Sequence, residues 1–333
     1  MLHMKKIQGS EVRWGIIGVG DVCEKKSAPA MQLIPHSSLV AVMRRNGAKA
    51  ADYAERHRVP RWYDSAEKLL TDEDINAVYI ATPPDSHATY TVQAARAGKP
   101  IYVEKPMART RAECKEMMEI CGQYQVPLYV AYYRRTLANF LKVKSLIDEG
   151  GIGAIRAVDI KLIKPLDPDI VTSSEGNWRT NPKVGGGGYF YDLASHQLDF
   201  LDYVFGPIEQ VRGHAGNQAG KYLAEDIVSA SYQFANGVLG TGLWCFTAHK
   251  TAEEEMTTII GEKGQIKYQN FGDNRVVLET TDGREVFEFD MPKHIQQPLI
   301  QSVVDDLLGV GSCPSTGETG MRTNWVMEQI IKQ

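Results

Sequence analysis

Three side chains in this sequence have the chemistry to stabilise a developing negative charge and to transfer a proton, namely Lys105, Asp192 and His196. Lys105 stands in Glu104-Lys105-Pro106, directly after a short apolar run with the pattern of a strand. In an open parallel sheet, ligands bind beyond the carboxyl ends of the strands, so a reacting group is expected at this position. Asp192 and His196 are four residues apart on a predicted helix and therefore share one face. Taken alone, these residues also fit a surface turn and a solvent-facing helix.

A glycine turn near the start of the chain has the pattern of a dinucleotide-binding turn. Gly18-Val19-Gly20 follows the apolar run Val12–Ile17 and precedes a predicted helix, Asp21–Ile34. The first glycine permits the tight turn, and the second lets the backbone approach a pyrophosphate, which the helix N-terminus attracts. Asp21 and Val22 open the helix and belong to the predicted cofactor contacts, and Cys23 replaces the third small residue that close helix–strand packing needs. An ordinary strand–helix turn is the alternative.

The residues after the second predicted strand bear on the choice of dinucleotide. Many NAD-binding folds place a carboxylate there to hold the ribose hydroxyls. Here the strand is followed by Arg44-Arg45-Asn46, which contains no carboxylate. Guanidinium groups pair bidentately with phosphate, so Arg44 and Arg45 favour NADP, with its 2′-phosphate, over NAD. Two solvated surface arginines are the alternative interpretation.

The elements that must position these residues alternate between strand and helix over the first 130 residues. This alternation predicts a parallel, doubly wound sheet of the Rossmann type. Further strands are expected at Ser38–Met43, Ala77–Ala81, Ile101–Val103 and Pro127–Tyr132, and helices at Asp21–Ile34, Ala48–His57, His87–Ala97 and from Thr110 to Gln125.

The second half of the chain has the pattern of an antiparallel sheet. A long strand is expected at Ala154–Ile163, and hairpin turns at Asn236-Gly237, Glu262-Lys263-Gly264 and Asp282-Gly283. Gly185–Gly188 precedes the helix Tyr189–Phe205, and its glycines are expected to let the backbone approach a ligand closely. Helices are expected again at Pro298–Leu308 and from Met321. We therefore predict a dinucleotide-binding domain over residues 1–132 and, over 133–333, an α+β domain with a large open sheet that binds substrate and forms oligomers.

Composition excludes several classes of function. The net charge is −4 and the pI is about 6.1, so no basic surface argues for nucleic acid. No apolar run reaches the 18 residues that a membrane span needs. The five cysteines are scattered without any Cys-x-x-Cys, which disfavours a disulfide framework or zinc site and favours a reducing cytoplasm. The histidines include no His-x-x-x-His pair, so no metal is expected.

Taken together, the motifs resemble the glucose-fructose oxidoreductase, inositol dehydrogenase and rhizopine-catabolism family, known as Gfo/Idh/MocA. The resemblance covers almost the whole chain in order. It rests on Trp14 to Gly20, Ala81-Thr82-Pro83-Pro84 with His87, Gly98-Lys99-Pro100 before Glu104-Lys105-Pro106, Arg134-Arg135, Gly186-Gly187-Gly188 to Asp192 and His196, and Pro314 to Glu318.

The resemblance implies roles for individual residues. In this family the lysine of the Glu-Lys-Pro motif, here Lys105, lies near the nicotinamide and the substrate oxygen. The helix histidine, here His196, exchanges the proton, and Asp192 holds a substrate hydroxyl or supports the histidine. The resemblance further implies that Thr82, Pro83, His87 and Glu104 line the cofactor groove, and that Trp178 and Arg179 reach the cofactor and active site. It also implies a homodimer or homotetramer packed through the sheet of the second domain.

The sequence therefore predicts an NADP(H)-linked oxidoreductase that transfers hydride to or from a sugar, keto-sugar or polyol-like substrate, with NAD as the alternative cofactor. Two other functions occur on related folds. An NAD-dependent glycosidase retains its NAD, which Arg44 and Arg45 disfavour. A non-catalytic dinucleotide sensor would not need Lys105, Asp192 and His196 together.

Overall fold

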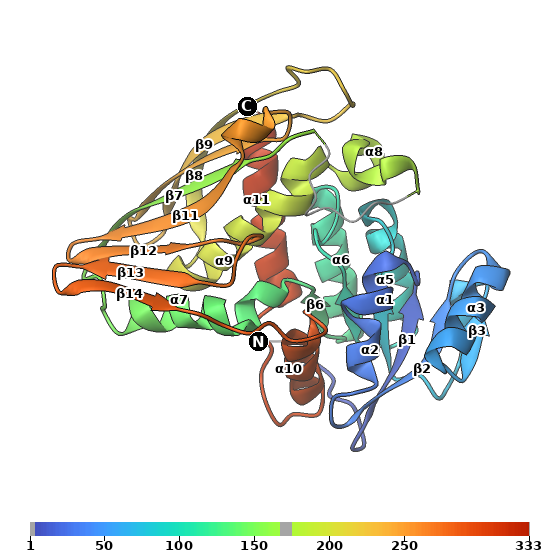
Figure 1. The fold of residues 1–333 in the computed structure, drawn as a ribbon. Helices are drawn as coiled ribbons and strands as arrows, with labels where there is room; N and C mark the ends of the chain where they lie inside the picture. Colours follow the sequence, from blue (N-terminus) through green and yellow to red (C-terminus); the bar gives the residue numbers. More distant parts are fainter. Residues whose placement is uncertain (1–3, 167–174, 333) are drawn as a thin grey trace. The chain divides into compact units, whose positions relative to one another are not determined.

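The computed structural model of the chain describes residues 4–166 and 175–332 (Figure 1). The chain forms two compact units. The first contains the chain up to residue 133 together with residues 292–321, and the second contains residues 134–291 and the chain from 322 onward. Residues 292–321 therefore pack with the first unit, although the division predicted from the sequence assigns them to the second domain. The helix α11 (Gly317–Ile331) begins in the first unit and ends in the second.

The first unit is built on a parallel sheet of six strands. Their order, β3-β2-β1-β4-β5-β6, is that of a Rossmann dinucleotide-binding fold. The order reverses between β1 and β4, and ligands bind such folds at the carboxyl edge of this reversal. The strands are β1 (Val12–Ile17), β2 (Ser37–Met43), β3 (Arg61–Tyr63), β4 (Ala77–Ile80), β5 (Ile101–Val103) and β6 (Leu128–Val130). The predicted doubly wound sheet is confirmed.

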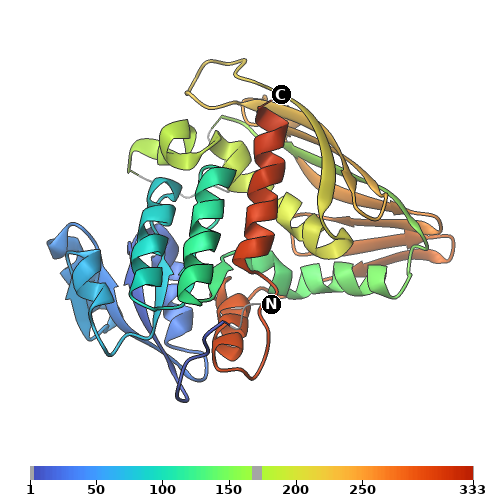
Figure 2. The same ribbon diagram turned by 180° about the vertical axis from the view of Figure 1, so that it is seen from behind.

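Helices cover both faces of this sheet, which gives the unit two apolar layers. One layer joins the sheet to α1 (Asp21–Lys25), α2 (Ala28–Met31), α3 (Gly47–His57) and α10 (Gln297–Leu307). The other joins it to α4 (Ala66–Leu70), α5 (His87–Arg96) and α6 (Arg111–Tyr124). In Figure 2, α5 and α6 lie in front of the sheet. Because both faces are buried, the strands are apolar on both sides, as parallel sheets require.

The helix predicted over Asp21–Ile34 is wrong in its extent. It divides into α1 and α2, with Ser27 between them and Pro29 in the first turn of α2. Proline has no N–H and clashes with the preceding turn of a helix, so a continuous helix is broken here. The helix that follows the glycine turn therefore has a single turn of five residues.

The second unit is built on an eight-stranded sheet with the order β14-β13-β12-β11-β7-β10-β9-β8. The three predicted hairpin turns connect β9 to β10, β11 to β12 and β13 to β14 and are confirmed. One pair, β7 with β10, is parallel, so the sheet is mainly antiparallel. The strands are β7 (Ile155–Ile163), β8 (Ile208–Gly216), β9 (Ile227–Phe234), β10 (Leu239–Cys245), β11 (Glu254–Gly261), β12 (Gly264–Tyr268), β13 (Val276–Thr280) and β14 (Gly283–Phe287).

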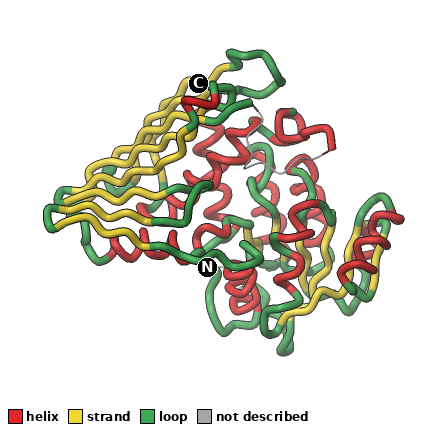
Figure 3. Tube along the Cα trace, in the orientation of Figure 1, coloured by secondary structure: helices red, strands yellow, loops and turns green. Residues whose placement is uncertain are grey.

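Helices pack against one face of this second sheet (Figure 3). Aromatic contacts join α7 (Ala138–Asp148), α9 (Ser195–Phe205) and the strands, as where Phe140 meets Phe200 and Tyr268. The buried Trp244 of β10 donates a hydrogen bond to Gln197 of α9 at 2.7 Å. Strand residues alternate between this buried face and the opposite one, as a half-covered sheet requires.

Candidate active site

The glycine turn after β1 is shaped by contacts with neighbouring strands. The amide of Gly18 donates to the carbonyl of Met43 at the end of β2, at 2.9 Å. Gly18 has φ +94°, and a Cβ atom there would lie 2.5 Å from Cγ2 of Thr82, so only glycine fits. Gly20 caps α1 with φ −124°, and a Cβ atom there would meet no other described residue within 4 Å. The turn therefore has open space at Gly20, which fits the pyrophosphate of a dinucleotide.

The residues that open α1 divide between surface and core. Asp21 is exposed and Val22 is half-buried, whereas Cys23 is fully buried. The hydroxyl of Tyr53 donates to the carbonyl of Cys23 at 2.8 Å, which ties α1 to α3. Burial raises the pKa of the Cys23 thiol to about 12, so the thiol stays protonated. Cys23 packs at this position as the small third residue predicted from the sequence.

The two arginines after β2 differ in their surroundings. Arg44 is half-buried and donates from Nη1 to the carbonyl of Val19 at 3.2 Å, so its guanidinium lies against the glycine turn. Arg45 is exposed. Asn46 is the cap of α3, since its side chain accepts from the amide of Lys49 at 3.1 Å. The segment Arg44-Arg45-Asn46 therefore places two positive charges and no negative charge at the end of β2.

The loop after β4 contains Thr82 and Pro83, which are both half-buried. Pro83 precedes the short helix η1 (Pro84–Ser86), and the hydroxyl of Ser86 donates to the hydroxyl of Thr82 at 2.8 Å. The resemblance places His87 in the lining of the cofactor groove, but its side chain is fully buried. Burial therefore excludes direct lining by the His87 side chain.

His87 instead lies between two loops. Its Nε2 lies 2.8 Å from the carbonyl of Thr82, and its Nδ1 lies 3.2 Å from the carbonyls of Pro106 and Met107. Burial lowers the pKa of the imidazole below its usual value, because a charged ring is poorly solvated there. A neutral ring can donate from one nitrogen only, so His87 bonds to one loop and packs against the other, between the loop after β4 and the loop that contains Lys105.

The loop after β5 presents Lys105 beside a buried carboxylate. Lys105 is half-buried, and its amide donates to Oε2 of Glu104 at 3.2 Å. The peptide bond between Lys105 and Pro106 is cis. Glu104 is buried and accepts from the hydroxyl of Tyr79 at 2.6 Å. The lysine lies at the carboxyl edge of the sheet, where the sequence predicts it.

In the second unit, Arg179 connects two of the predicted site residues. Its Nε donates to Oδ2 of Asp192 at 2.9 Å, and both side chains are largely buried. Its guanidinium also stacks on the ring of Trp178, 4.5 Å from the ring centroid. Trp178 and Arg179 belong to η3 (Glu175–Thr180). The arginine therefore holds the Asp192 carboxylate in a fixed orientation, a contact that the sequence did not indicate.

The helix that contains Asp192 and His196 is not regular throughout. Phe190–Ala194 forms one π-helical turn, η4, and α9 begins at Ser195. Such single π turns are frequent at functional sites, because the wider turn changes the direction of side chains. His196 is buried, and its ring meets the ring of Phe271 edge-to-face with centroids 5.9 Å apart. Phe271, on the loop after β12, is half-buried and was not predicted as a site residue.

Three glycines of the run before η4 lie close to other parts of the chain. A Cβ atom at Gly185 would lie 2.9 Å from the carbonyl oxygen of Arg179, and one at Gly187 would lie 2.3 Å from the ring of Tyr191. At Gly188 it would lie 2.6 Å from Cβ of Ala224. These three glycines are needed because the chain packs closely on itself. The close approach of a ligand to this run stays a prediction.

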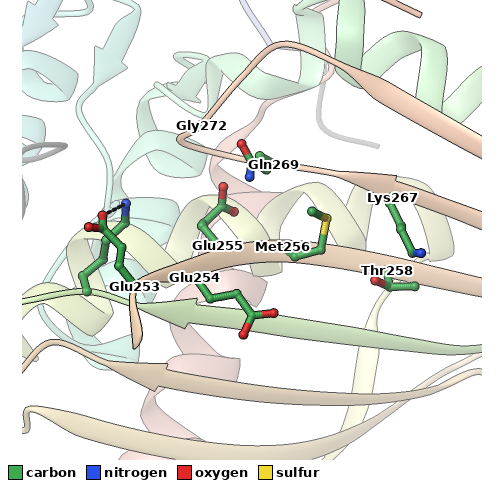
Figure 4. A pocket seen from close by; sticks show the side chains of 9 residues that line it. Glu253, Glu254, Glu255, Met256, Thr258, Lys267, Gln269 and Gly272 are labelled. Carbon is green, nitrogen blue, oxygen red and sulfur yellow. Dashed lines mark hydrogen bonds and ion pairs between the residues drawn. The ribbon is translucent and has the colours of Figure 1, made fainter. Parts of the chain in front are cut away.

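A cavity of about 620 Å³ lies on the second unit's sheet, lined in part by β11 and β12 (Figure 4). Most of its charged groups form ion pairs: Lys164 pairs with Glu253 at 2.8 Å, and Lys267 pairs with Glu279 at 2.9 Å. The buried Glu255 instead accepts from the backbone amides of Asn270 and Phe271. We assign no chemistry to this cavity.

Among the described residues, no group of three or more His, Cys, Asp or Glu side chains could hold a metal ion. The same part of the chain contains no helix long and apolar enough to cross a membrane.

Each unit therefore presents part of the predicted site. Gly18, Gly20, Arg44 and Lys105 lie in the first unit, and Arg179, Asp192 and His196 lie in the second. The second unit also contains Phe271, which the sequence did not predict. The partnership of Lys105 with His196 stays a prediction. The contacts of Phe271 and Arg179 could not be found from spacing, since no local motif links them to the residues that they touch.

Comparison with known proteins identifies the family of this chain. Residues 12–132 match the oxidoreductase family model with an NAD-binding Rossmann fold, and residues 140–267 match the GFO/IDH/MocA C-terminal domain. An oxidoreductase of Formosa agariphila is 38% identical over 96% of this chain and 98% of its own length. The chain belongs to the Gfo/Idh/MocA family. It is an oxidoreductase with an NAD(P)-binding Rossmann domain, as the sequence predicts.

Other relatives show the range of the family. A 1,5-anhydro-D-fructose reductase of Ensifer adhaerens is 27% identical over 93% of this chain and 92% of its own. The WlbA dehydrogenase of Bordetella pertussis, solved with NADH and UDP-GlcNAcA, has a TM-score of 0.82 at 25% identity, covering 96% of this chain and 95% of its own. A 3-ketoreductase of Actinomadura kijaniata, solved with NADP, has a TM-score of 0.82 at 21% identity, covering 96% of this chain and 97% of its own. The two structures contain different cofactors.

Proposed function

We propose that this protein uses NADPH to reduce a keto-sugar or a related polyol-like carbonyl compound. The observation that carries the cofactor choice is Arg44, whose guanidinium lies against the glycine turn with no carboxylate in the Arg44-Arg45-Asn46 segment. A carboxylate would repel a 2′-phosphate, whereas a guanidinium pairs with it. The reductase and dehydrogenase names of the relatives support a carbohydrate substrate. Reduction is the proposed direction because cells generally keep NADP pools reduced.

The proposed chemistry divides between residues of the two units. A nicotinamide bound by the first unit would supply the hydride for the carbonyl carbon. Lys105 stabilises the negative charge that develops on the carbonyl oxygen, which a positioned cation does effectively away from bulk water. His196 delivers the proton, because imidazole titrates near neutral pH. Asp192, oriented by Arg179, accepts a hydrogen bond from a substrate hydroxyl and fixes the sugar ring.

The proposal is tested by following the loss of NADPH absorbance with keto-sugars, aldoses and inosose-type ketones. The gain of absorbance with NADP⁺ and dihydrodiols tests the opposite direction. We expect turnover of a cyclic keto-sugar, with a specificity constant for NADPH well above that for NADH. Lys105→Ala should lower kcat far more than it changes the KM for NADPH. His196→Asn should lower kcat by about 10²–10⁴-fold and flatten the pH–rate profile. Lys115→Ala, at an exposed position of α6, is the matched control.

Several outcomes would contradict the proposal. Near-normal turnover by Lys105→Ala, or an unchanged pH–rate profile in His196→Asn, would remove these residues from the mechanism. Equal specificity constants for NADPH and NADH would refute the role of Arg44. Purified protein that carries stoichiometric NAD and releases aryl glycosides would show the glycosidase function instead. Cofactor binding without turnover of any sugar would indicate a sensor.

We also propose a homodimer or homotetramer that packs through the sheet of the second unit. Leu239 of β10 and Ile260 of β11 both pair with Ala157 of β7, so the three form one row on the face away from the helices. Leu239 and Ile260 are 58% and 42% exposed, which leaves an apolar row available to a second copy. Light scattering after size exclusion should show an oligomer that Ile260→Lys dissociates. A wild-type monomer would refute this proposal. A cytoplasmic location stays a prediction.

A further inference from the structure

We infer that Gln296 is a positioning residue for Lys105 and acts through the carboxylate of Glu104. Gln296 lies in the segment that returns to the first unit from the far end of the chain, 192 residues from Glu104. The inference rests on the proposed function, because it assumes that Lys105 acts on the substrate oxygen. It adds a residue that no motif of the sequence indicated.

The contacts of Glu104 show how the amide of Gln296 reaches the lysine loop. Glu104 is 8% exposed, and its Oε1 accepts from Nε2 of Gln296 and from the hydroxyl of Tyr79, both at 2.6 Å. Its Oε2 accepts from the amide of Lys105 at 3.2 Å. Three neutral donors thus stabilise a buried carboxylate, which fixes the backbone from which the Lys105 side chain projects.

The orientation of the Gln296 amide is determined by a second tyrosine. Gln296 is fully buried, and its Oε1 accepts from the hydroxyl of Tyr102 at 2.9 Å. Tyr102 stacks on Tyr79 with ring centroids 4.9 Å apart. Burial raises the pKa of both phenols well above the usual value, so both hydroxyls remain donors. The amide carbonyl must therefore face Tyr102, and the NH₂ group must face Glu104.

The backbone of the same segment is anchored to α1, the helix after the glycine turn. The amide of Gln296 donates to the carbonyl of Lys26 at 3.1 Å. The ring of His294, which is also buried, lies with Nδ1 2.6 Å from the carbonyl of Lys25. One short segment therefore connects the end of α1 with the carboxylate beneath Lys105. This gives the lysine a fixed position relative to the turn that is proposed to hold the pyrophosphate.

The test compares two substitutions at this position with a neighbouring control. Gln296→Met keeps the length of the side chain but removes the hydrogen bonds to Glu104 and Tyr102. We expect kcat to fall by about 10- to 100-fold, with the KM for NADPH changed less than about threefold, because misplacement of a reacting group mainly affects the transition state. Gln297→Met, on the half-buried neighbour, should retain wild-type kcat.

Gln296→Glu provides a conservative rescue. When protonated, the introduced carboxyl group can still donate to Glu104, and when ionised it places a second negative charge against it. We expect near-normal kcat at the acidic end of the profile and a loss as pH rises, which a purely structural role would not produce. Circular dichroism and urea unfolding at each pH establish that the variants are folded.

A readout without turnover uses the lysine itself. Reductive methylation with ¹³C-formaldehyde lets the Lys105 side chain be followed by NMR in the protein without cofactor. Gln296→Met should change the chemical shift and line width of the methylated Lys105 signal, because the loop that contains Lys105 loses one of its anchors. An unchanged Lys105 signal and unchanged kcat in a folded Gln296→Met protein would overturn the inference. If Lys105→Ala itself keeps turnover, the proposed function fails; if Lys105→Ala is inactive and Gln296→Met is not, only this inference fails.

Discussion

Alanine substitutions at the two glycines of the turn after β1 should affect different properties. Gly18→Ala should mainly lower stability, whereas Gly20→Ala should mainly weaken cofactor binding. At Gly18, φ is +94°, and the new Cβ would lie 2.5 Å from Cγ2 and 3.1 Å from the amide nitrogen of Thr82. At Gly20, φ is −124° and ψ is −162°, a conformation that alanine adopts freely. No other described residue has a heavy atom within 4 Å of a Cβ there. The first substitution therefore strains the protein, and the second fills space proposed for the pyrophosphate.

The expected magnitudes follow from these contacts. Gly18→Ala should lower the free energy of unfolding by about 1–2 kcal/mol for the positive φ and about 1–3 kcal/mol more for the overlap with Thr82. Gly20→Ala should change it by less than about 1 kcal/mol, and alanine's smaller unfolded-state entropy even favours stabilisation. The affinity of the Gly20→Ala protein for NADPH should fall at least about 100-fold, or about 2.7 kcal/mol.

Urea unfolding without cofactor and calorimetric titration with NADPH measure the two effects separately. Gly98→Ala is the matched control, because Gly98 also has positive φ, at +68°, but ends α5 with open space around it. It should cost only the conformational strain and leave NADPH affinity unchanged. If Gly20→Ala binds NADPH within about twofold of wild type, the dinucleotide does not lie on this turn and the reasoning fails.

Three further predictions concern charged and titratable groups. Arg44→Gln should lower the specificity constant for NADPH by about 30- to 150-fold in steady-state assays, with little effect on the constant for NADH. Arg45→Gln, at an exposed position, should lower the constant for NADPH by less than about fivefold. Equal losses in the two variants would contradict the proposed role of Arg44. Burial depresses the pKa of His87, so its contribution to stability is present above its unfolded pKa of about 6.5 and is lost as pH falls below it, by at most about 1.4 kcal/mol per pH unit. Urea unfolding from pH 7.5 to 5.5 should show a smaller slope in His87→Gln, and identical slopes would refute this. Arg135→Met should destabilise the protein by about 3–5 kcal/mol in urea at pH 7, because it leaves the buried carboxylate of Asp199, 2.7 Å from the guanidinium, without compensation; a change below about 1 kcal/mol would show that the pair is dispensable.

The elements predicted correctly are those whose causes lie close together in the chain. The parallel strands of the first unit follow from apolar runs spaced by helices, and the hairpins of the second from Asn-Gly and Asp-Gly turns. The helix predicted from Thr110 to Gln125 likewise has a local cause, because the hydroxyl of Thr110 accepts from the amide of Glu113 at 3.2 Å and caps its first turn. The interruption at Pro29 is also local, and the predicted helix over Asp21–Ile34 is wrong in its extent because proline cannot continue a helix in its interior.

Other features arise only when distant segments pack together. The residues Phe190–Ala194 contain no local pattern that indicates a π turn. The parallel pairing of β7 with β10 depends on the order in which the strands join the sheet. Gly185, Gly187 and Gly188 indicated close approach correctly, and the atoms that approach the position of a Cβ there belong to the chain itself. A glycine shows that room is needed and does not show which atoms occupy it.

The same division holds for the site. By itself, the sequence determined the family, the Rossmann turn, and the residue types available for charge and proton transfer, because each depends on short spacings along the chain. Only the tertiary structure decided that His87 is buried between two loops, that Arg179 holds Asp192, and that Gln296 reaches Glu104. Hydrogen bonds act over about 3 Å in space irrespective of distance along the chain, so partners brought together by folding leave no spacing to detect in one sequence.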